Sequence, residues 1–330
     1  MDPQTFIGVD VSKTWLEFAI AVKGSSFILR FKFDNNNAGF RNLVTALRTN
    51  RVVIGGKVLV TIENGSYGDS FINFMHKKKC LICVESALRI KKSLGLQRGK
   101  NDSIDAERIL DYSMKNKEKL FLWKAPRKLI IQLKDLLTNR ERAIRLLNAL
   151  EVPLAELKAK YKRHDWLKIK RLNTGGIDGL QETIKKIDTE IQSIAKSDKE
   201  ISRQMTLLTS VPGIGKIIAL HLICRTNEFS MYKTGKTLAC LAGVAPFEYS
   251  SGTLAGKGHV SSYHNKILKQ YLHMGAVSSL RSKTSELRKY YDRKVAEGKH
   301  KMLVINNLRN KILLRAAAVI RKGEPYKPLP

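Results

Sequence analysis

The sequence predicts an α/β domain with a mixed sheet, followed by a mainly helical second half. Short apolar runs with strand spacing alternate with helical patterns up to about residue 125, and helical periodicity dominates from about Pro126 onward. With 330 residues, the chain is also longer than one typical core requires. We therefore expect three parts: an α/β domain over 1–125, a helical linker over 126–204 and a mostly helical domain over 205–330.

The first domain opens with three apolar segments that we expect to form antiparallel strands. They are Phe6–Val11, Trp15–Val22 and Ser26–Phe33. The connection between the first two is short enough for a hairpin. Beyond them, helices are expected to alternate with buried strands. We place these helices at 36–47 and 67–77, and the strands at 58–62 and 81–84. A mixed sheet flanked by helices in this order resembles a ribonuclease-H-like fold.

The predicted linker contains a seam of apolar residues that recur at steps of three and four. The seam residues are Ile177, Leu180, Ile184, Ile187, Ile191 and Ile194. Polar residues occupy the positions between them, so the stripe is narrower than that of a single helix packed on a globular core. The seam predicts a coiled-coil arm, paired within the chain or with a second copy, that serves for spacing and oligomerisation.

The third domain opens with a Pro-Gly-x-Gly turn between two apolar helical stretches. This pattern is typical of a helix-hairpin-helix, in which glycines allow close approach and the N–H groups that open the second helix hold a phosphate. Gly213, Gly215 and Lys216 are therefore candidate nucleic-acid contacts, although the glycines would equally serve a plain tight turn. Lys257, in the later loop from Phe247 to Gly258, is a further candidate.

The charge of the chain points to an anionic partner. Lys and Arg number 60 against 29 Asp and Glu, a formal net charge of +31 at pH 7. Such self-repulsion is best tolerated beside a polyanion, and nucleic acid is a stronger candidate than an anionic membrane. No apolar run approaches the roughly 20 residues of a bilayer span, and no signal-peptide pattern opens the chain. We expect a cytoplasmic protein that binds nucleic acid and no membrane.

Four cysteines bear on the cellular compartment. Cys80 and Cys83 form a C-x-x-C, but they lie in a short apolar run and no second Cys or His pair has zinc spacing. We expect buried thiols on a strand rather than a redox or zinc site. Cys224 and Cys240 lie in apolar stretches and are expected in the core. This usage fits a reducing cytoplasm.

Four acidic residues stand out against the basic background. Asp10 and Glu63 each end a predicted central strand, where a charge is rarely buried without a partner or a metal. Asp102 and Asp105 are three residues apart, so a helix there presents both on one face. Four carboxylates without Cys or His suit Mg²⁺ or Mn²⁺, and two such ions about 4 Å apart can promote phosphodiester cleavage.

Individually, these acidic residues have ordinary structural explanations. Asp102 could be an N-cap with Asp105 in the first helical turn, and Asp10 could be a strand-end turn residue. The four together, in so basic a chain, favour a metal site.

Six segments resemble a known family of enzymes. FIGVDVSK, IENGSY and KNDSIDA (6–13, 62–67 and 100–106) are similar to the three acidic blocks of the DEDD-type insertion-sequence transposases, the IS-one-ten family. VPGIG, LAGVAP and YSSG (211–215, 241–246 and 249–252) are similar to its later blocks, in the same order. The resemblance implies a RuvC-like nuclease domain, a coiled coil and a C-terminal transposase domain.

The resemblance also implies site residues. It places Asp10, Glu63, Asp102 and Asp105 on the family's metal-binding positions and the nucleophilic serine on Ser251. From side-chain chemistry alone, Ser250 and Ser251 are equivalent, and a serine needs activation by the metal site or by Lys257 or His259 in the same loop.

The activity and partners implied by the resemblance are those of a DNA recombinase guided by a bridge RNA. Strand cleavage would pass through a transient phosphoserine link to DNA. The implied partners are double-stranded donor and target DNA, the guide RNA and further copies of the chain, as a dimer or tetramer. The implied location is a prokaryotic cytoplasm, with nucleoid association during activity. Because Ser251 and the carboxylates lie in different predicted domains, a dimer built on the seam could complete the site in trans.

Two other functions remain open on the residues. A metal-dependent nuclease or Holliday-junction resolvase that uses water would explain the four carboxylates, but would leave the loop around Ser251 without a role. A non-enzymatic basic nucleic-acid-binding protein would explain the charge and the glycine turn, but not acidic residues at the ends of central strands.

Overall fold

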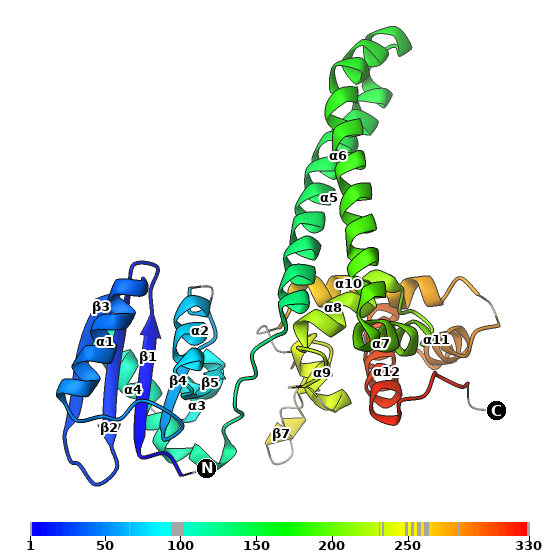
Figure 1. Cartoon of the computed structure of the whole chain (residues 1–330). Coiled ribbons are helices and arrows are strands. Elements are labelled where there is room, and N and C mark those ends of the chain that lie inside the picture. The colour runs from blue at the N-terminus through cyan, green and yellow to red at the C-terminus, as the bar shows by residue number, and fades with distance from the viewer. Residues whose placement is uncertain are drawn as a thin grey trace. The chain divides into compact units, whose positions relative to one another are not determined.

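The computed structural model describes residues 2–65, 67–93, 102–230, 232, 234–247, 250–251, 254–255, 259–260, 264–282 and 284–328. The chain forms two compact units, one on each side of the bond between Ala125 and Pro126 (Figure 1). The further division of the second unit into a linker and a third domain stays a prediction.

The first unit is built around a five-stranded mixed sheet, which confirms the expected α/β class. Its strands are β1 (Thr5–Val11), β2 (Trp15–Val22), β3 (Ile28–Asp34), β4 (Val58–Glu63) and β5 (Leu81–Glu85). Their order is β3-β2-β1-β4-β5. The first three pair as antiparallel strands, and β4 and β5 extend the sheet in parallel to β1.

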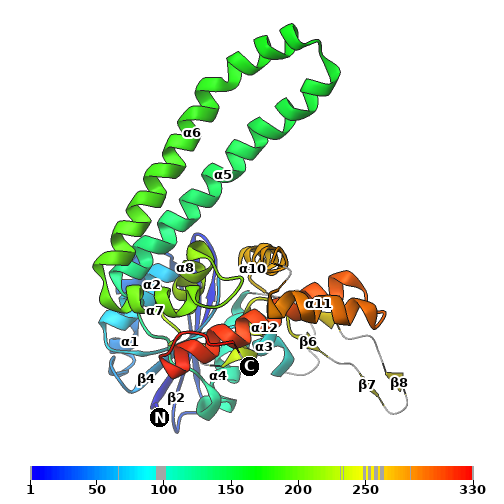
Figure 2. The ribbon, with the colours of Figure 1, turned by 90° about the vertical axis from the view of Figure 1, so that its right-hand side faces the viewer.

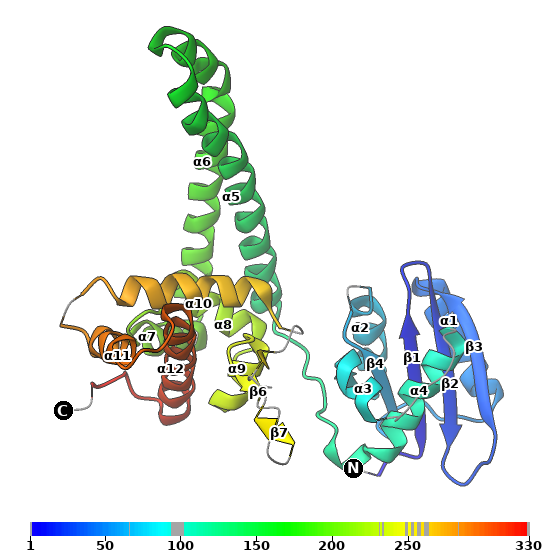
Figure 3. The ribbon, with the colours of Figure 1, turned by 180° about the vertical axis from the view of Figure 1, so that it is seen from behind.

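Helices cover both faces of this sheet. The helices are α1 (Asn37–Thr49), α2 (Asp69–Lys77), α3 (Ala87–Ser93) and α4 (Asp102–Lys115), followed by the short 3₁₀ turn η1 (Lys117–Lys119). Alternate strand residues serve opposite faces. Ile7 and Val9 share a core with α1 and α2, whereas Phe6 shares one with α4. Figure 1 accordingly shows α1 in front of the sheet, and Figure 3, from behind, shows α4 in front.

The second unit is mainly helical. Two long helices, α5 (Lys128–Lys160) and α6 (Arg163–Ser197), form an antiparallel hairpin that extends away from the rest of the unit (Figure 2). The other helices are α7 (Lys199–Thr209), α8 (Lys216–Arg225), α9 (Gly235–Leu241), α10 (Lys266–Ser279), α11 (Glu286–Ala296) and α12 (Lys301–Lys322). Within the described ranges, no helix has both the length and the apolar content that a membrane crossing requires.

The described residues of the second unit also include four two-residue strands. They are β6 (Pro246–Phe247), β7 (Ser250–Ser251), β8 (Leu254–Ala255) and β9 (His259–Val260). β6 pairs with β9, and β7 pairs with β8, both in antiparallel fashion.

The apolar seam of α6 packs against α5 of the same chain. Ile191 and Ile194, near the base of the hairpin, are buried in a core that includes Leu133 and Leu137 of α5. The other seam residues are half-buried; they are Ile177, Leu180, Ile184 and Ile187. Pairing within the chain is therefore present, and pairing of the seam with a second copy stays a prediction.

The cysteines follow the predicted burial except in one case. Cys80, Cys83 and Cys224 are buried, as expected. Burial raises the pKa of the Cys83 thiol to about 12. The expectation of a buried Cys240 is wrong, because this thiol is exposed. The short helix α9 buries Leu238 and Ala239, and Cys240 lies on its outer face.

Candidate active site

Two predicted carboxylates lie at the same end of the first unit's sheet. β1 and β4 run parallel, and Val9 faces Ile62 in their register. Asp10 and Glu63 are the next residues, so they stand at one level at the carboxyl ends of neighbouring strands. Their side chains alternate with those of Val9 and Ile62, which point into the core of α1 and α2. Asp10 and Glu63 therefore belong to the face that α4 covers.

Helix α4 brings the other two acidic residues to this face. The helix begins at Asp102 and packs over β1, β2 and β4. Its approach depends on Gly8, where a Cβ would lie 2.3 Å from the carbonyl oxygen of Ala106 and 2.4 Å from the amide nitrogen of Leu110. The backbone of β1 at Gly8 therefore packs directly against the backbone of α4 at Ala106, the residue after Asp105. The side chain of Asp102 lies outside the described residues.

The electrostatics of Glu63 link it to Asp105. Burial raises the pKa of the Glu63 carboxyl, and the negative charge of Asp105 raises it further. Asp105 also accepts a hydrogen bond from Arg108 Nη1 at 2.7 Å. Two carboxylates that are far apart in the chain thus act on one another, and their role as metal ligands stays a prediction.

A third strand-end carboxylate, Glu85, has a different environment. Glu85 of β5 is the register partner of Glu63. Its Oε2 accepts a hydrogen bond from the Tyr112 hydroxyl at 2.9 Å and lies 3.0 Å from Arg89 Nη1. The charge of Glu85 is therefore balanced within the protein by Arg89.

Glu17 repeats this arrangement on the other side of β1. It stands opposite Asp10 in the β1–β2 register, and its Oε1 lies 2.7 Å from Lys32 Nζ. Glu63 differs from both outer acidic residues, because no cationic side chain pairs with it in the part of the chain that the structure describes. The sequence analysis did not identify Glu17 and Glu85. Only the strand register shows that they lie beside Asp10 and Glu63 in the sheet.

The chemistry of these residues suits a divalent cation. Asp and Glu oxygens are the ligands that Mg²⁺ and Mn²⁺ prefer. Burial and, to a smaller extent, the charge of Asp105 raise the pKa of Glu63, and a bound cation would oppose both effects by favouring the ionised carboxylate. Among the described side chains, no three acidic, His or Cys groups come together closely enough to hold a metal. Asp10, Glu63 and Asp105 thus form no closed three-ligand site by themselves, and the fourth predicted ligand, Asp102, lies outside that set.

The candidate serine lies in a small β-ladder of the second unit. Ser250 and Ser251 form β7, and Ser251 faces Leu254 of β8 in the register. The side chains of both serines lie outside the described residues. Lys257 also lies outside them, and His259 opens β9.

The predicted glycine turn lies between α7 and α8. Gly213 has a φ of +91°, and a Cβ there would lie 3.0 Å from the carbonyl oxygen of Gly275 in α10. Gly213 therefore allows close packing against α10. Gly215 precedes α8 and has open space where a Cβ would stand, and Lys216 is exposed. A nucleic-acid role for these three residues stays a prediction.

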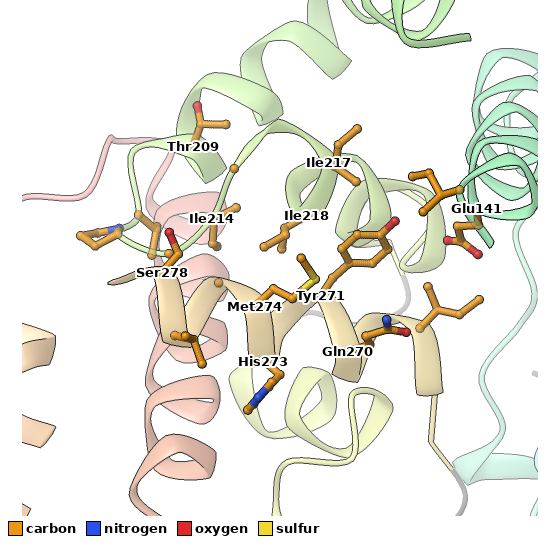
Figure 4. Close-up of a pocket in the computed structure, with 18 of the residues that line it drawn as sticks. Glu141, Thr209, Ile214, Ile217, Ile218, Gln270, Tyr271, His273, Met274 and Ser278 are labelled. Carbon is orange, nitrogen blue, oxygen red and sulfur yellow. The ribbon is translucent and has the colours of Figure 1, made fainter. Parts of the chain in front are cut away.

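A groove of about 1150 Å³ opens beside this turn, lined by α5, α8 and α10. Figure 4 shows Thr209 and Ile214 toward one end and Glu141 and Tyr271 toward the other. Beneath Tyr271 lies His221, whose ring centroid is 4.6 Å from that of Tyr271.

His221 belongs to a buried polar group that the sequence does not reveal. Only 2% of its side chain is exposed, and its Nε2 lies 3.2 Å from Glu141 Oε1. Burial, together with the charges of Arg225 and Arg140, lowers the pKa of His221 to about 3. Burial also raises the pKa of Glu141. The group lies between α5 and α8, at the base of the long hairpin.

Two family models match the chain over most of its length. A model described as a transposase, of the DEDD type of IS110, matches residues 7–157. A second model, described as the transposase IS116/IS110/IS902 family, matches residues 205–292.

Individual relatives agree with these matches. The chain is 26% identical over 329 residues to a pilin gene-inverting protein of Moraxella bovis, which covers 98% of both chains. It is 26% identical over 185 residues to an uncharacterised 42 kDa protein of insertion element IS900 from Mycobacterium paratuberculosis, covering 55% of this chain and 46% of that one. It is 32% identical over 122 residues to an uncharacterised 43.6 kDa protein of insertion element IS110 from Streptomyces coelicolor, covering 37% of this chain and 30% of that one.

Proposed function

Because the chain belongs to the IS110 family of transposases, we propose that it cleaves and rejoins DNA strands at a divalent-metal site formed by Asp10, Glu63, Asp102 and Asp105. One observation carries this proposal: Asp10 and Glu63 lie at one level near the carboxyl ends of neighbouring parallel strands, on the face where α4 begins with the other two acidic residues. The effect of Asp105 on the pKa of Glu63 supports it. A protein that merely binds DNA gains nothing from negative charge gathered in this way.

The nucleophile in this proposal is Ser251. Its Oγ forms a bond to phosphorus while the bond from phosphorus to a deoxyribose oxygen breaks. The serine loses its proton, and the departing oxygen gains one. Attack by the hydroxyl of another DNA end then reverses the exchange, rejoins a strand and frees Ser251. Bound Mg²⁺ or Mn²⁺ would stabilise the charge that develops on the phosphate oxygens.

The proposed partners are double-stranded donor and target DNA, a guide RNA and further copies of the chain. The net charge of +31 supports binding to more than one polyanion. Base pairing to a guide RNA would supply sequence selection, as it does in other guide-directed nucleases. Oligomerisation through the half-buried seam of α6 would let one subunit's Ser251 act with another subunit's carboxylates.

Covalent trapping tests the nucleophile directly. The full chain is incubated with Mg²⁺, guide RNA and labelled DNA, then denatured and digested, and the DNA-linked peptide is mapped by mass spectrometry. We expect a link at Ser251 that is lost in Ser251→Ala and kept in Ser250→Ala. Asp105→Asn should abolish the link while DNA binding persists.

The same experiment separates the alternative activity. A nuclease or junction resolvase that uses water is the second candidate, because the four carboxylates alone could support it. If Ser251→Ala protein still cuts DNA in the presence of Mg²⁺, the serine mechanism is wrong and the water mechanism is favoured. A link that maps to Ser250 would move the nucleophile by one residue.

A further inference from the structure

The tip of the α5–α6 hairpin carries a dense group of cations. We define the tip as residues 156–172, where α5 ends, two residues connect the helices and α6 begins. Its basic residues are Lys158, Lys160, Lys162, Arg163, Lys168, Lys170 and Arg171. The acidic residues of this segment are Glu156 and Asp165. All the basic side chains are exposed.

These cations do not hold the hairpin together through ion pairs. Within the described residues, no ion pair involves any basic side chain of the tip. The shaft of the hairpin is different, because Arg140 pairs with Asp188 at 2.6 Å and Lys186 pairs with Glu182 at 2.7 Å. The tip therefore gathers mutually repelling charges that internal packing does not require, as expected where an external anion supplies the counter-charge.

Trp166 gives the tip a defined shape. Its Nε1 donates a hydrogen bond to the carbonyl oxygen of Leu154 at 3.0 Å, which joins the two helices. Lys158 Nζ and Lys170 Nζ lie 5.4 and 5.3 Å from the centre of the Trp166 ring, one from each helix. These cation–π contacts keep two charges on a packed scaffold rather than on a frayed helix end.

The length of the hairpin determines how far this charge lies from the globular part of the second unit. α5 contains 33 residues. At 1.5 Å per residue it is about 50 Å long. The lower part of α5 is packed in the globular part, where Glu141 contacts His221 of α8. The 19 residues from Glu141 to Lys160 span about 29 Å, so the tip is just under one 35 Å turn of B-DNA, or about 8 base pairs, away.

We propose that the tip binds the phosphate backbone of double-stranded DNA that flanks the segment held by the globular part of the second unit. This inference rests on the proposed function, which makes duplex DNA the substrate. The contact is independent of sequence, since exposed lysines neutralise phosphates as point charges. A lipid surface fits less well, because the tip exposes only two large apolar side chains in its described residues, Tyr161 and Leu172.

Salt-dependent binding tests this proposal. The variant Lys160→Gln, Lys162→Gln, Arg163→Gln, Lys168→Gln removes four charges and leaves the lysines over Trp166 in place. Affinity for a duplex of about 40 base pairs is measured without Mg²⁺ over a range of salt concentrations. If two to four phosphate contacts are lost, the slope of log affinity against log salt falls by about 2 to 4, and affinity at 0.15 M salt falls about 30- to 1000-fold.

A matched variant isolates the effect of charge. Lys160→Arg, Lys162→Arg, Arg163→Lys, Lys168→Arg keeps every charge and should bind with the wild-type slope. Circular dichroism checks that both variants keep their helices. An unchanged slope in the neutral variant would overturn the proposal, as would an equal loss in both variants. The proposal would also be overturned if the neutral variant lost binding to vesicles containing phosphatidylserine while its DNA binding stayed unchanged.

DNA binding by the tip can be tested separately from strand cleavage, which is the proposed function. Because binding is measured without Mg²⁺, it does not depend on strand cleavage. At saturating DNA, the neutral variant should still form the link at Ser251. If even the wild-type protein forms no such link, the proposed function fails while the measured role of the tip stands.

Discussion

Replacing Gly8 with alanine tests whether the packing of α4 on β1 positions the acidic end of the sheet. The new Cβ would lie 2.3, 2.4 and 2.8 Å from three backbone atoms of α4, where ordinary contact begins at 3.4 Å. The helix must therefore move by about 1 Å, and overpacking of this kind costs about 1–3 kcal/mol of unfolding free energy. The same movement carries Asp105 away from Glu63, and a 1 Å misplacement lowers catalytic rates by about 100-fold.

The assay follows stability and activity in the full chain. Hydrogen exchange of amides in β1 and α4 reports the stability of the first unit, and the rate of Ser251–DNA link formation at saturating DNA reports activity. Gly56→Ala is the matched control, since its Cβ would meet nothing nearer than the carbonyl oxygen of Lys79 at 4.0 Å. The reasoning is refuted if Gly8→Ala matches this control in both protection and rate.

Three further predictions concern other parts of the molecule. The pKa of His221 is about 3 in the folded protein, below its ordinary value of 6.5. Below pH 6.5 the unfolded chain therefore binds a proton at His221 that the folded protein does not bind, and the free energy of unfolding falls. By pH 5 this loss of stability is about 2 kcal/mol. In His221→Phe, the free energy of unfolding should fall less between pH 6.5 and pH 5 than in the wild type. The same pH profile in both proteins would contradict the lowered pKa of His221. Gly175 and Gly179 lie within α6 with open space around them, so Gly175→Ala and Gly179→Ala should each stabilise the protein by about 0.5–1 kcal/mol in thermal unfolding; destabilisation would show a packing role. A thiol reagent should label the exposed Cys240 of the folded protein well before the buried Cys83, as peptide mass spectrometry can check; equal rates would contradict the burial pattern.

The sheet was predictable because each strand carries a strong local signal. Trp15–Val22 has the same bounds in the sequence pattern and in the structure, since both faces of β2 are covered and every residue of the run except Glu17 is apolar. The third strand begins at Ile28 rather than Ser26, because its edge position exposes alternate residues and weakens the signal. The four strands around Ser251 contain two residues each, too few for any periodicity to show.

The candidate site was predictable in its positions but not in its environment. Asp10 and Glu63 could be placed at strand ends from local pattern alone. The need for glycine at position 8 depends on a helix almost a hundred residues later in the chain, so it appears only in the packed fold. In the same way, Glu85 is as acidic as Glu63 in sequence, and only the fold shows that Tyr112 and Arg89 neutralise it.

Titration of Mn²⁺ into the full chain, followed by electron paramagnetic resonance of the free ion, tests the central claim most directly. The account predicts that wild-type protein binds Mn²⁺, that Asp10→Asn, Glu63→Gln and Asp105→Asn each weaken this binding strongly, and that Glu85→Gln binds like wild type. Equal Mn²⁺ binding by all of these proteins, or none by the wild type, would contradict it.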